Sequence, residues 1–360
     1  MVDYLVVILS SGLMSNAHPI VVFITAGILT ALPIFLFMAF FALAAVYAER
    51  KVSAFMQDRL GPMGQGAGFH AGKWGLLQTV ADAIKLVIKE DIIPAKADRK
   101  LFILAPFIVF VGAFITYVAL PFNQVIMAAD FNIGIFYILA VASLGVIGII
   151  LAGYGSNNKW SLYGAMRSAA QIVSYEIPAA LSILTVIMLV GSLEMQEIIM
   201  AQSGTIWGFL PNWFIFNNPF TFLAFFIYFI SGVAEVNRTP FDLPETESEL
   251  VAGFHTEYSG IRWGFFFLAE YAYVFIVAAV ASIVFLGGWQ SLIPGIMAGP
   301  GWGLFWFFAK TGFLFFVMMW FRWTFPRLRV DQLMKVCWKF FLPFAFINIL
   351  GVGIWDLFVR

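Results

Sequence analysis

The feature that most constrains this chain is a series of long apolar runs separated by polar connections. A helix needs about 20 apolar residues to cross a bilayer. Eight runs reach or approach this length, at 21–48, 101–120, 133–153, 168–192, 219–234, 263–287, 302–321 and 338–358. The runs are apolar on every face, whereas the strands of a membrane barrel alternate apolar and polar residues. Only 11% of the 360 residues are charged, against about 25% in a soluble domain. We therefore predict an all-α integral membrane protein with eight transmembrane helices, of which 219–234 is the shortest.

The distribution of basic residues predicts the orientation of these helices. Eight helices place the connections 49–100, 154–167, 235–262 and 322–339 on one side of the membrane, and these connections hold 18 of the 20 Lys and Arg residues. Lys and Arg are enriched in cytoplasmic loops. The four connections are therefore predicted to face the cytoplasm, or the matrix of an organelle, and both termini to lie on the periplasmic side. We predict a single polytopic membrane domain over residues 1–360.

The first connection, 49–100, contains a predicted surface helix at about 74–90. Its polar residues Gln78, Asp82, Lys85 and Lys89 recur at steps of four, three and four, and apolar residues occupy the opposite face. This pattern is typical of an amphipathic helix that lies along the membrane surface. Periodicity alone favours simple interfacial anchoring.

Three of the predicted transmembrane helices, 168–192, 263–287 and 302–321, each carry a charged residue in their interior. Glu176, in the segment SYEIP, lies about two turns inside its helix, and Pro178 removes a backbone hydrogen bond next to it. Glu270 and Lys310 lie in the sixth and seventh helices. Intramembrane charges are costly and usually functional. The alternative for Glu176 is a protonated side chain in an interhelical hydrogen bond, and Lys310 is a candidate for a relay or an ion pair.

The connection 235–260, EVNRTPFDLPETESELVAGFHTEYSG, gathers six acidic residues between two apolar runs. Pro240 and Pro244 prevent a regular helix through the turn, and Asp242 is a candidate cap for a short helix that follows. Partial burial and mutual repulsion would raise the pKa of clustered carboxylates, so that some hold and release protons near neutral pH. The alternative is a solvated acidic loop.

The sequence predicts no metal site and no cofactor bound by this chain alone. Cys337 is the single cysteine, so the chain contains no internal disulfide and cannot ligate an iron–sulfur cluster by itself. Its three histidines are fewer than the four that two bis-histidine haems require.

Several segments together carry a resemblance to a known family. AERK at 48–51, RLGP at 59–62, SNNK at 156–159, SYEIP at 174–178, the acidic connection and PRLRVDQLM at 326–334 resemble the H-type membrane subunit of bacterial NADH:quinone oxidoreductase, respiratory complex I. The mitochondrial counterpart of that family is NADH dehydrogenase subunit 1. The resemblance extends from the first predicted helix to the last, and the acidic motif is long and specific. It implies eight transmembrane helices with periplasmic termini.

The resemblance also implies roles for individual residues. The quinone cavity would involve Glu49, Arg50, Arg59, Arg238, Arg322 and Arg327. A proton relay would involve Asp82, Glu176, Glu235, Glu245, Glu247, Glu249 and Glu270. The chain would form the quinone entrance and the lower cavity, and would couple quinone reduction to proton translocation.

The same family places the rest of the chemistry in partner subunits. FMN and iron–sulfur clusters would be held by other chains, and the quinone head group mainly by adjacent hydrophilic subunits. Small membrane subunits and membrane lipid would be further neighbours, without nucleic acid. The implied location is a bacterial cell inner membrane, with the mitochondrial inner membrane as the alternative.

Two other functions remain open from the sequence. One is the equivalent membrane subunit of an energy-converting hydrogenase or formate hydrogenlyase, against which the RLGP and PRLRVDQLM segments argue. The other is a secondary ion transporter that acts alone. Such transporters usually contain an internal repeat with paired broken helices, and the first half of this chain has no counterpart of the acidic connection.

Overall fold

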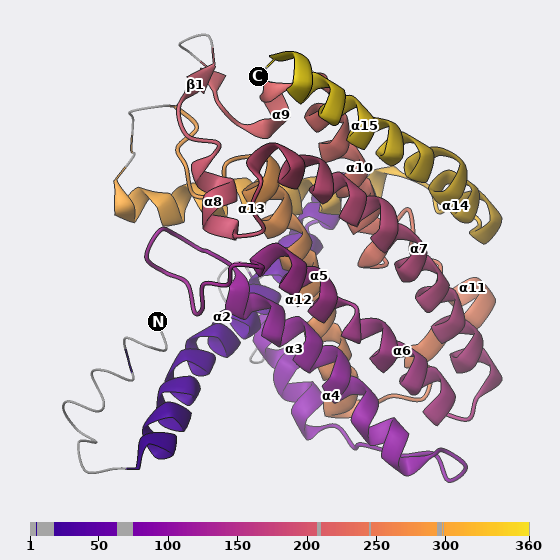
Figure 1. Ribbon diagram of the computed structural model, residues 1–360. Coiled ribbons are helices and arrows are strands. Elements are labelled where there is room, and N and C mark those ends of the chain that lie inside the picture. The colour runs from indigo at the N-terminus through magenta and orange to yellow at the C-terminus, as the bar shows by residue number, and fades with distance from the viewer. Residues whose placement is uncertain are drawn as a thin grey trace.

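The computed structural model describes residues 5, 18–62, 75–206, 210–244, 246–293, 297 and 299–359. Helices dominate this part of the chain (Figure 1). The elements are α2 (Pro19–Met56), α3 (Leu77–Ile88), α4 (Arg99–Thr116), η2 (Tyr117–Ala119), α5 (Gly134–Ala142), α6 (Leu144–Gly155), α7 (Lys159–Val190), α8 (Met195–Met200), β1 (Thr205–Ile206), β2 (Leu210–Pro211), α9 (Phe214–Asn217), α10 (Pro219–Glu235), α11 (Glu247–Leu250), η3 (Gly253–His255), α12 (Gly260–Phe285), α13 (Pro300–Thr324), α14 (Val330–Val336), the π-helical η4 (Cys337–Phe341) and α15 (Leu342–Val359).

Seven helices in the described residues are long and apolar enough to cross a membrane. They confirm an all-α, multi-pass membrane protein. The remaining predicted helix, 219–234, corresponds to α10, which is apolar but only 17 residues long. The count of eight transmembrane helices and the periplasmic side of the termini stay predictions.

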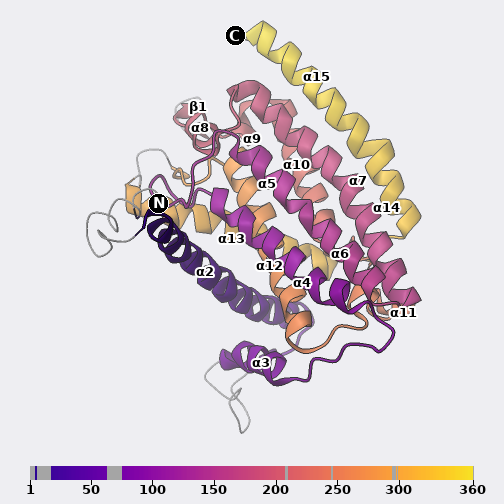
Figure 2. The ribbon, with the colours of Figure 1, turned by 60° about the horizontal axis from the view of Figure 1, so that its bottom comes forward.

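Helix α12 lies at the centre of the bundle and organises its neighbours. Of its most apolar stretch, 78% of the residues are buried, compared with 17% for α2 and for Val330–Phe358. Figure 2 shows α2 along one side of the bundle and α15 along the opposite edge. Helix α12 packs against α4, α10 and α13, and against the C-terminal half of α2. Side chains on α12 therefore reach elements from both ends of the sequence.

Two predicted helices differ in detail from the observed ones. The run 133–153 is not one regular helix, because it divides at Ser143 into α5 and α6. The Ser143 hydroxyl donates to the Leu139 carbonyl at 3.1 Å, a bond that often bends a helix. Helix α7 instead continues through Pro178 without a break. The proline that the sequence marks as a weak point therefore leaves Glu176 on a continuous helix.

The amphipathic helix α3, which lies below α2 in Figure 2, is connected to two other helices. Asp82 pairs with Arg50 of α2 at 2.7 Å. Beyond its C-terminus, Asp91 pairs with Arg262 of α12 at 3.1 Å, and the Ser259 hydroxyl donates to the Glu90 carbonyl. The surface helix therefore bridges α2 and α12.

The acidic connection is joined to the last basic connection. Asp242 does not cap a helix, because Thr246 precedes the short helix α11. It pairs instead with Arg327 at 2.9 Å, and the Leu328 amide donates to the Pro240 carbonyl. The two loops that the sequence places on one side of the membrane are thus in direct contact.

Close approach between helices depends on small residues, as is common in membrane bundles. A Cβ atom built on Gly153 of α6 would lie 2.3 Å from the Ala165 Cβ and 2.9 Å from the Ser161 carbonyl oxygen of α7. A side chain at this position would therefore force α6 away from α7.

We predict that Gly153→Ala destabilises the folded chain by about 1–3 kcal/mol, the usual cost of overpacking a core. The matched control is Gly27→Ala, because no atom lies within 4 Å of a Cβ built on Gly27. Heating of detergent-solubilised membranes, with the tagged chain followed in the soluble fraction, compares the two. Equal melting temperatures for both variants would contradict the prediction.

Candidate functional site

A buried carboxylate, Glu49, joins three other segments near the C-terminal end of α2. Arg238, which follows α10, donates from Nη1 to both carboxylate oxygens at 3.3 Å. The Tyr271 hydroxyl of α12 donates to Oε2 at 2.5 Å, and Arg322 of α13 donates to Oε1. Glu49 is 6% exposed, and a charge so buried requires partners of this kind. We call these four residues the Glu49 cluster.

Arg238 links this cluster to a second carboxylate. Its Nη2 lies 3.0 Å from Oε1 of Glu270, and its guanidinium carbon lies 4.6 Å from the centre of the Tyr271 ring. The Arg238 amide donates to the Val233 carbonyl at the end of α10, which fixes where the side chain starts. One cation therefore lies between Glu49 and Glu270.

The Glu49 cluster borders a cavity of about 490 Å³. Arginine side chains and aromatic rings line this space, together with the carboxylates just described. The lining residues are Val46, Glu49, Arg50, Ser53, Arg238, Ala252, His255, Trp263, Phe267, Glu270, Tyr271, Arg322 and Trp323. Planar ring surfaces beside fixed guanidinium donors suit a flat ligand that carries hydrogen-bond acceptors.

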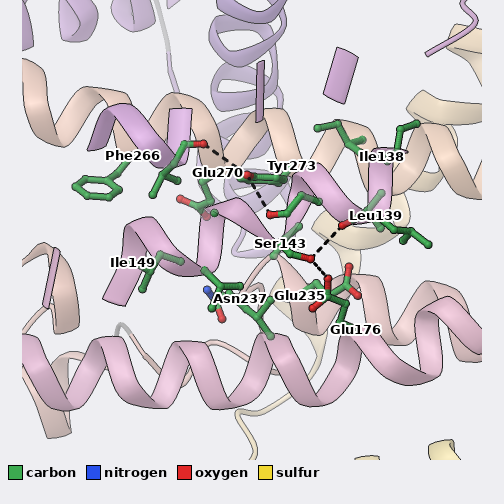
Figure 3. Close-up of a pocket in the computed structure, with 18 of the residues that line it drawn as sticks. Ile138, Leu139, Ser143, Ile149, Glu176, Glu235, Asn237, Phe266, Glu270 and Tyr273 are labelled. Carbon is green, nitrogen blue, oxygen red and sulfur yellow. Dashed lines mark hydrogen bonds between the residues drawn. The ribbon is translucent and has the colours of Figure 1, made fainter. Parts of the chain in front are cut away.

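A second, smaller cavity of about 110 Å³ contains three carboxylates in largely apolar walls. Glu176 of α7, Glu235 of α10 and Glu270 of α12 line it. Ser143 donates to Oε1 of Glu176, and Figure 3 shows Glu235 beside this pair. Oε1 of Glu235 is buried and has no hydrogen-bond partner among the described residues. An arrangement of carboxylates with few fixed partners can exchange protons with each other or with trapped water.

Two residues line both cavities. Glu270 and His255 belong to the wall of the larger cavity and to that of the smaller one. The two cavities therefore share part of one wall. Glu270 joins an ionic, arginine-rich space to an apolar, carboxylate-lined space.

Of the other predicted residues whose side chains the structure describes, Arg50 lines a cavity, whereas Asp82, Arg59, Arg327 and Glu249 line neither cavity. Arg50 lines the larger cavity and pairs with Asp82. Arg59 is exposed and donates to Gln57. Arg327 contacts Asp242, and Glu249 is an exposed partner of Arg167 at 2.5 Å.

Two further predicted relay residues cannot be placed with respect to the cavities. Glu247 begins α11, and its side chain lies outside the described part of the structure. Glu245 is itself outside the described residues.

The described residues contain no group of three His, Cys, Asp or Glu side chains able to hold a metal ion. The chemistry available within the two cavities is that of guanidinium donors, ring surfaces and carboxylates.

The family model described as NADH dehydrogenase matches residues 29–353 of this chain. The chain belongs to this family. A relative in Chlorobium luteolum, named as the H subunit of NADH-quinone oxidoreductase, is 53% identical over 92% of this chain and 89% of its own length. Relatives with the same name in Bacteroides thetaiotaomicron and a Geobacillus species are each 48% identical, over 87% and 92% of this chain and 86% and 92% of their own lengths. The resemblance seen in the sequence motifs is thereby confirmed.

Sequence reasoning missed several residues at the site of this NADH dehydrogenase family member. Tyr271 donates to a carboxylate 222 positions away, and no local pattern predicts such a pair. Ser143 looks like an ordinary small residue within an apolar run, and Asn237 is one more polar residue in the loop. Asn237 has a positive φ of 51° and its side-chain amide donates to Ser168. Its position directly before Arg238 is the one signal that the sequence offered.

We predict that Arg50→Ala raises the apparent KM for quinone by about threefold to tenfold without loss of the folded chain. The Arg50–Asp82 pair is more than one-third exposed on both sides, and such pairs contribute about 0–1 kcal/mol to stability. We expect the cavity-lining guanidinium of Arg50 to contact quinone, so that its loss weakens quinone binding instead. Quinone titration of native membranes measures the effect, and Lys85→Ala, which removes the other partner of Asp82, is the control. An unchanged KM in Arg50→Ala would contradict the prediction.

Proposed function

We propose that this chain is the membrane subunit of a proton-translocating NADH:quinone oxidoreductase, and that it forms the quinone entrance and the lower part of the quinone cavity. The observation that carries the proposal is the pair of adjoining cavities with Glu270 and His255 in both walls. One cavity has the chemistry to hold a quinone, and the other has the chemistry to pass protons onward.

The larger cavity fits a quinone ring by size and by chemistry. Its volume of about 490 Å³ lies in the range of about 300–1,000 Å³ for ligand pockets. The rings of Trp263, Phe267 and Trp323 offer apolar faces. Arg322 and Arg50 offer N–H donors to the carbonyl oxygens of a quinone, and these donors would stabilise negative charge that develops on the oxygens during reduction.

The Glu49 cluster can transmit a change of charge to the smaller cavity. Arg238 contacts both Glu49 and Glu270. Arg238 would respond to new negative charge in the larger cavity by a shift in its contacts, which weakens its hold on Glu270. Glu270 would then gain affinity for a proton, and Glu235 and Glu176 lie along the same wall. We propose this order of residues as the start of the proton relay.

The remaining predicted residues enter the proposal through the family resemblance. Asp82, Glu245, Glu247 and Glu249 would belong to the acidic surface beneath the cavity, and Arg59 and Arg327 to its basic rim. FMN and iron–sulfur clusters would be held by partner subunits, and catalysis would require the assembled complex. We propose a bacterial inner membrane as the location, with lipid and the other subunits as neighbours.

The decisive experiment identifies what assembles with the chain. The tagged chain is extracted gently from its native membrane, and its partners are identified by mass spectrometry and absorbance. Flavin and iron–sulfur subunits together with NADH:quinone reductase activity would support the proposal. Nickel–iron subunits without an NADH-oxidising module would replace it with the hydrogenase function. A chain that is extracted alone and moves ions would replace it with the transporter function.

A further inference from the structure

Lys310 is a buried cation within α13 that neither cavity uses. It is 8% exposed, and its Nζ donates to the carbonyls of Leu286, Gly288 and Gln290 at 2.6, 2.9 and 2.7 Å. The Nζ also lies 4.2 Å from the centre of the Trp213 ring. No Asp or Glu in the described part of the chain forms an ion pair with it. These contacts therefore do not provide an ion pair, which is one of the two roles left open from the sequence.

The three carbonyls belong to the turn that ends α12. Leu286 is the C-terminal cap of this helix, where carbonyl groups lack helical partners and the helix dipole favours a positive charge. Gly287 and Gly288 have positive φ values of 71° and 50°, which glycine adopts without strain. This backbone turns back on itself so that its carbonyls converge on one ammonium group.

The turn is tightly packed around this contact. A Cβ atom built on Gly287 would lie 2.6 Å from Nε1 of Trp213, and Gln202 accepts from the Gly287 amide at 2.8 Å. Lys310 thus attaches α13 to a rigid end of α12.

Both helices also contact the Glu49 cluster. Tyr271 of α12 and Arg322 of α13 both donate to Glu49. Lys310 and Arg322 are 12 residues apart, which corresponds to about 18 Å along α13 at 1.5 Å per residue. Helices α12 and α13 run antiparallel, since Tyr271 precedes the end of α12 at Leu286 whereas Arg322 follows Lys310. Lys310 and Arg322 therefore fix the position of α13 relative to α12 at two levels along the helix axis.

We propose that Lys310 is a positioning residue for the quinone-binding site, which sets the position of α13 along α12 so that Arg322 and Tyr271 both reach Glu49. This inference rests on the proposed function, because it assumes that the Glu49 cluster borders the quinone. Lys310 acts only through α13 and touches neither cavity.

The test is a double-mutant cycle in the assembled complex. Lys310→Met is expected to raise the quinone KM by about tenfold, because displacement of a binding group by about 1 Å can cost up to ~10²-fold, with a smaller change in kcat. Arg322→Ala alone is expected to raise KM as well. In the Arg322→Ala background, Lys310→Met should add little, since residues that act through one another are not additive.

Two control variants separate positioning from simple stability. Lys339→Met removes an exposed lysine of η4 and should leave KM unchanged. Lys310→Arg keeps a charged donor and should raise the quinone KM by less than Lys310→Met does. If the complex with Lys310→Met fails to assemble, Lys310→Gln takes its place in the test. Gln keeps two N–H donors and should raise the quinone KM by less than Met.

The possible results distinguish the two proposals. An unchanged KM in assembled Lys310→Met or Lys310→Gln, with a raised KM in Arg322→Ala, would overturn the positioning role alone. Full additivity of the two substitutions would overturn it as well. An unchanged KM in Arg322→Ala would instead contradict the proposed function of the Glu49 cluster.

Discussion

Glu49→Gln is expected to lower kcat/KM for quinone by about 100-fold or more. The substitution removes a carboxylate that holds Arg238, Arg322 and Tyr271 at once. Removal of one partner from a buried ion pair costs about 3–5 kcal/mol, and each 1.36 kcal/mol in transition-state stabilisation is a factor of ten. Both guanidinium groups can then move, and the larger cavity loses its shape.

Measurement of NADH:quinone activity in native membranes checks this result, and oxidation of NADH by ferricyanide shows whether the complex has assembled. Glu90→Gln is the matched control, because Glu90 is exposed and lines neither cavity. A variant that reduces quinone normally would show that the Glu49 cluster is not part of the quinone site.

Glu235→Gln is expected to lower the maximal rate of quinone-coupled proton translocation by about tenfold or more, with little change in the quinone KM. Glu235 lines the smaller cavity but not the larger one. An amide in its place can still form hydrogen bonds but cannot take up and release a proton. Positioned acid–base groups typically contribute about 10²–10⁴-fold to the rate of a proton transfer.

Inverted membrane vesicles, with a pH-sensitive dye and simultaneous NADH oxidation, measure both quantities. Glu197→Gln is the control, since Glu197 is an exposed residue of α8 that lines neither cavity. A lower kcat/KM for quinone in Glu49→Gln, together with slower proton translocation at an unchanged quinone KM in Glu235→Gln, is the signature of two adjoining cavities with different tasks. Normal proton translocation in Glu235→Gln would remove this residue from the relay.

Hydrophobic length predicted the long apolar helices, because it depends on local composition, whereas the orientation drawn from the basic residues stays a prediction. The acids within apolar runs were also recognisable, since a carboxylate in such a context is costly and therefore informative. Glu176 and Glu270 do line one cavity. The division of one predicted helix at Ser143 was not recognisable, because a single serine in an apolar run is compatible with a regular helix.

The sequence could not predict which charges pair across the fold. Asp242 resembled a helix cap but contacts Arg327, and Glu249, whose relay role stays a prediction, pairs with Arg167. Lys310 had no visible partner within the sequence because its partners are backbone carbonyls. Each of these contacts depends on the arrangement of distant helices, which local propensity does not specify.

The order of synthesis gives the Glu49 cluster a further consequence. Arg238, Tyr271 and Arg322 follow Glu49 by 189, 222 and 273 positions. At about 5–20 residues per second, a ribosome needs on the order of 10–60 s after Glu49 to complete the set. Glu49 therefore spends that time without its full set of partners. The last third of the chain supplies Tyr271 and Arg322, so a product that ends before Tyr271 lacks two of the three partners of Glu49.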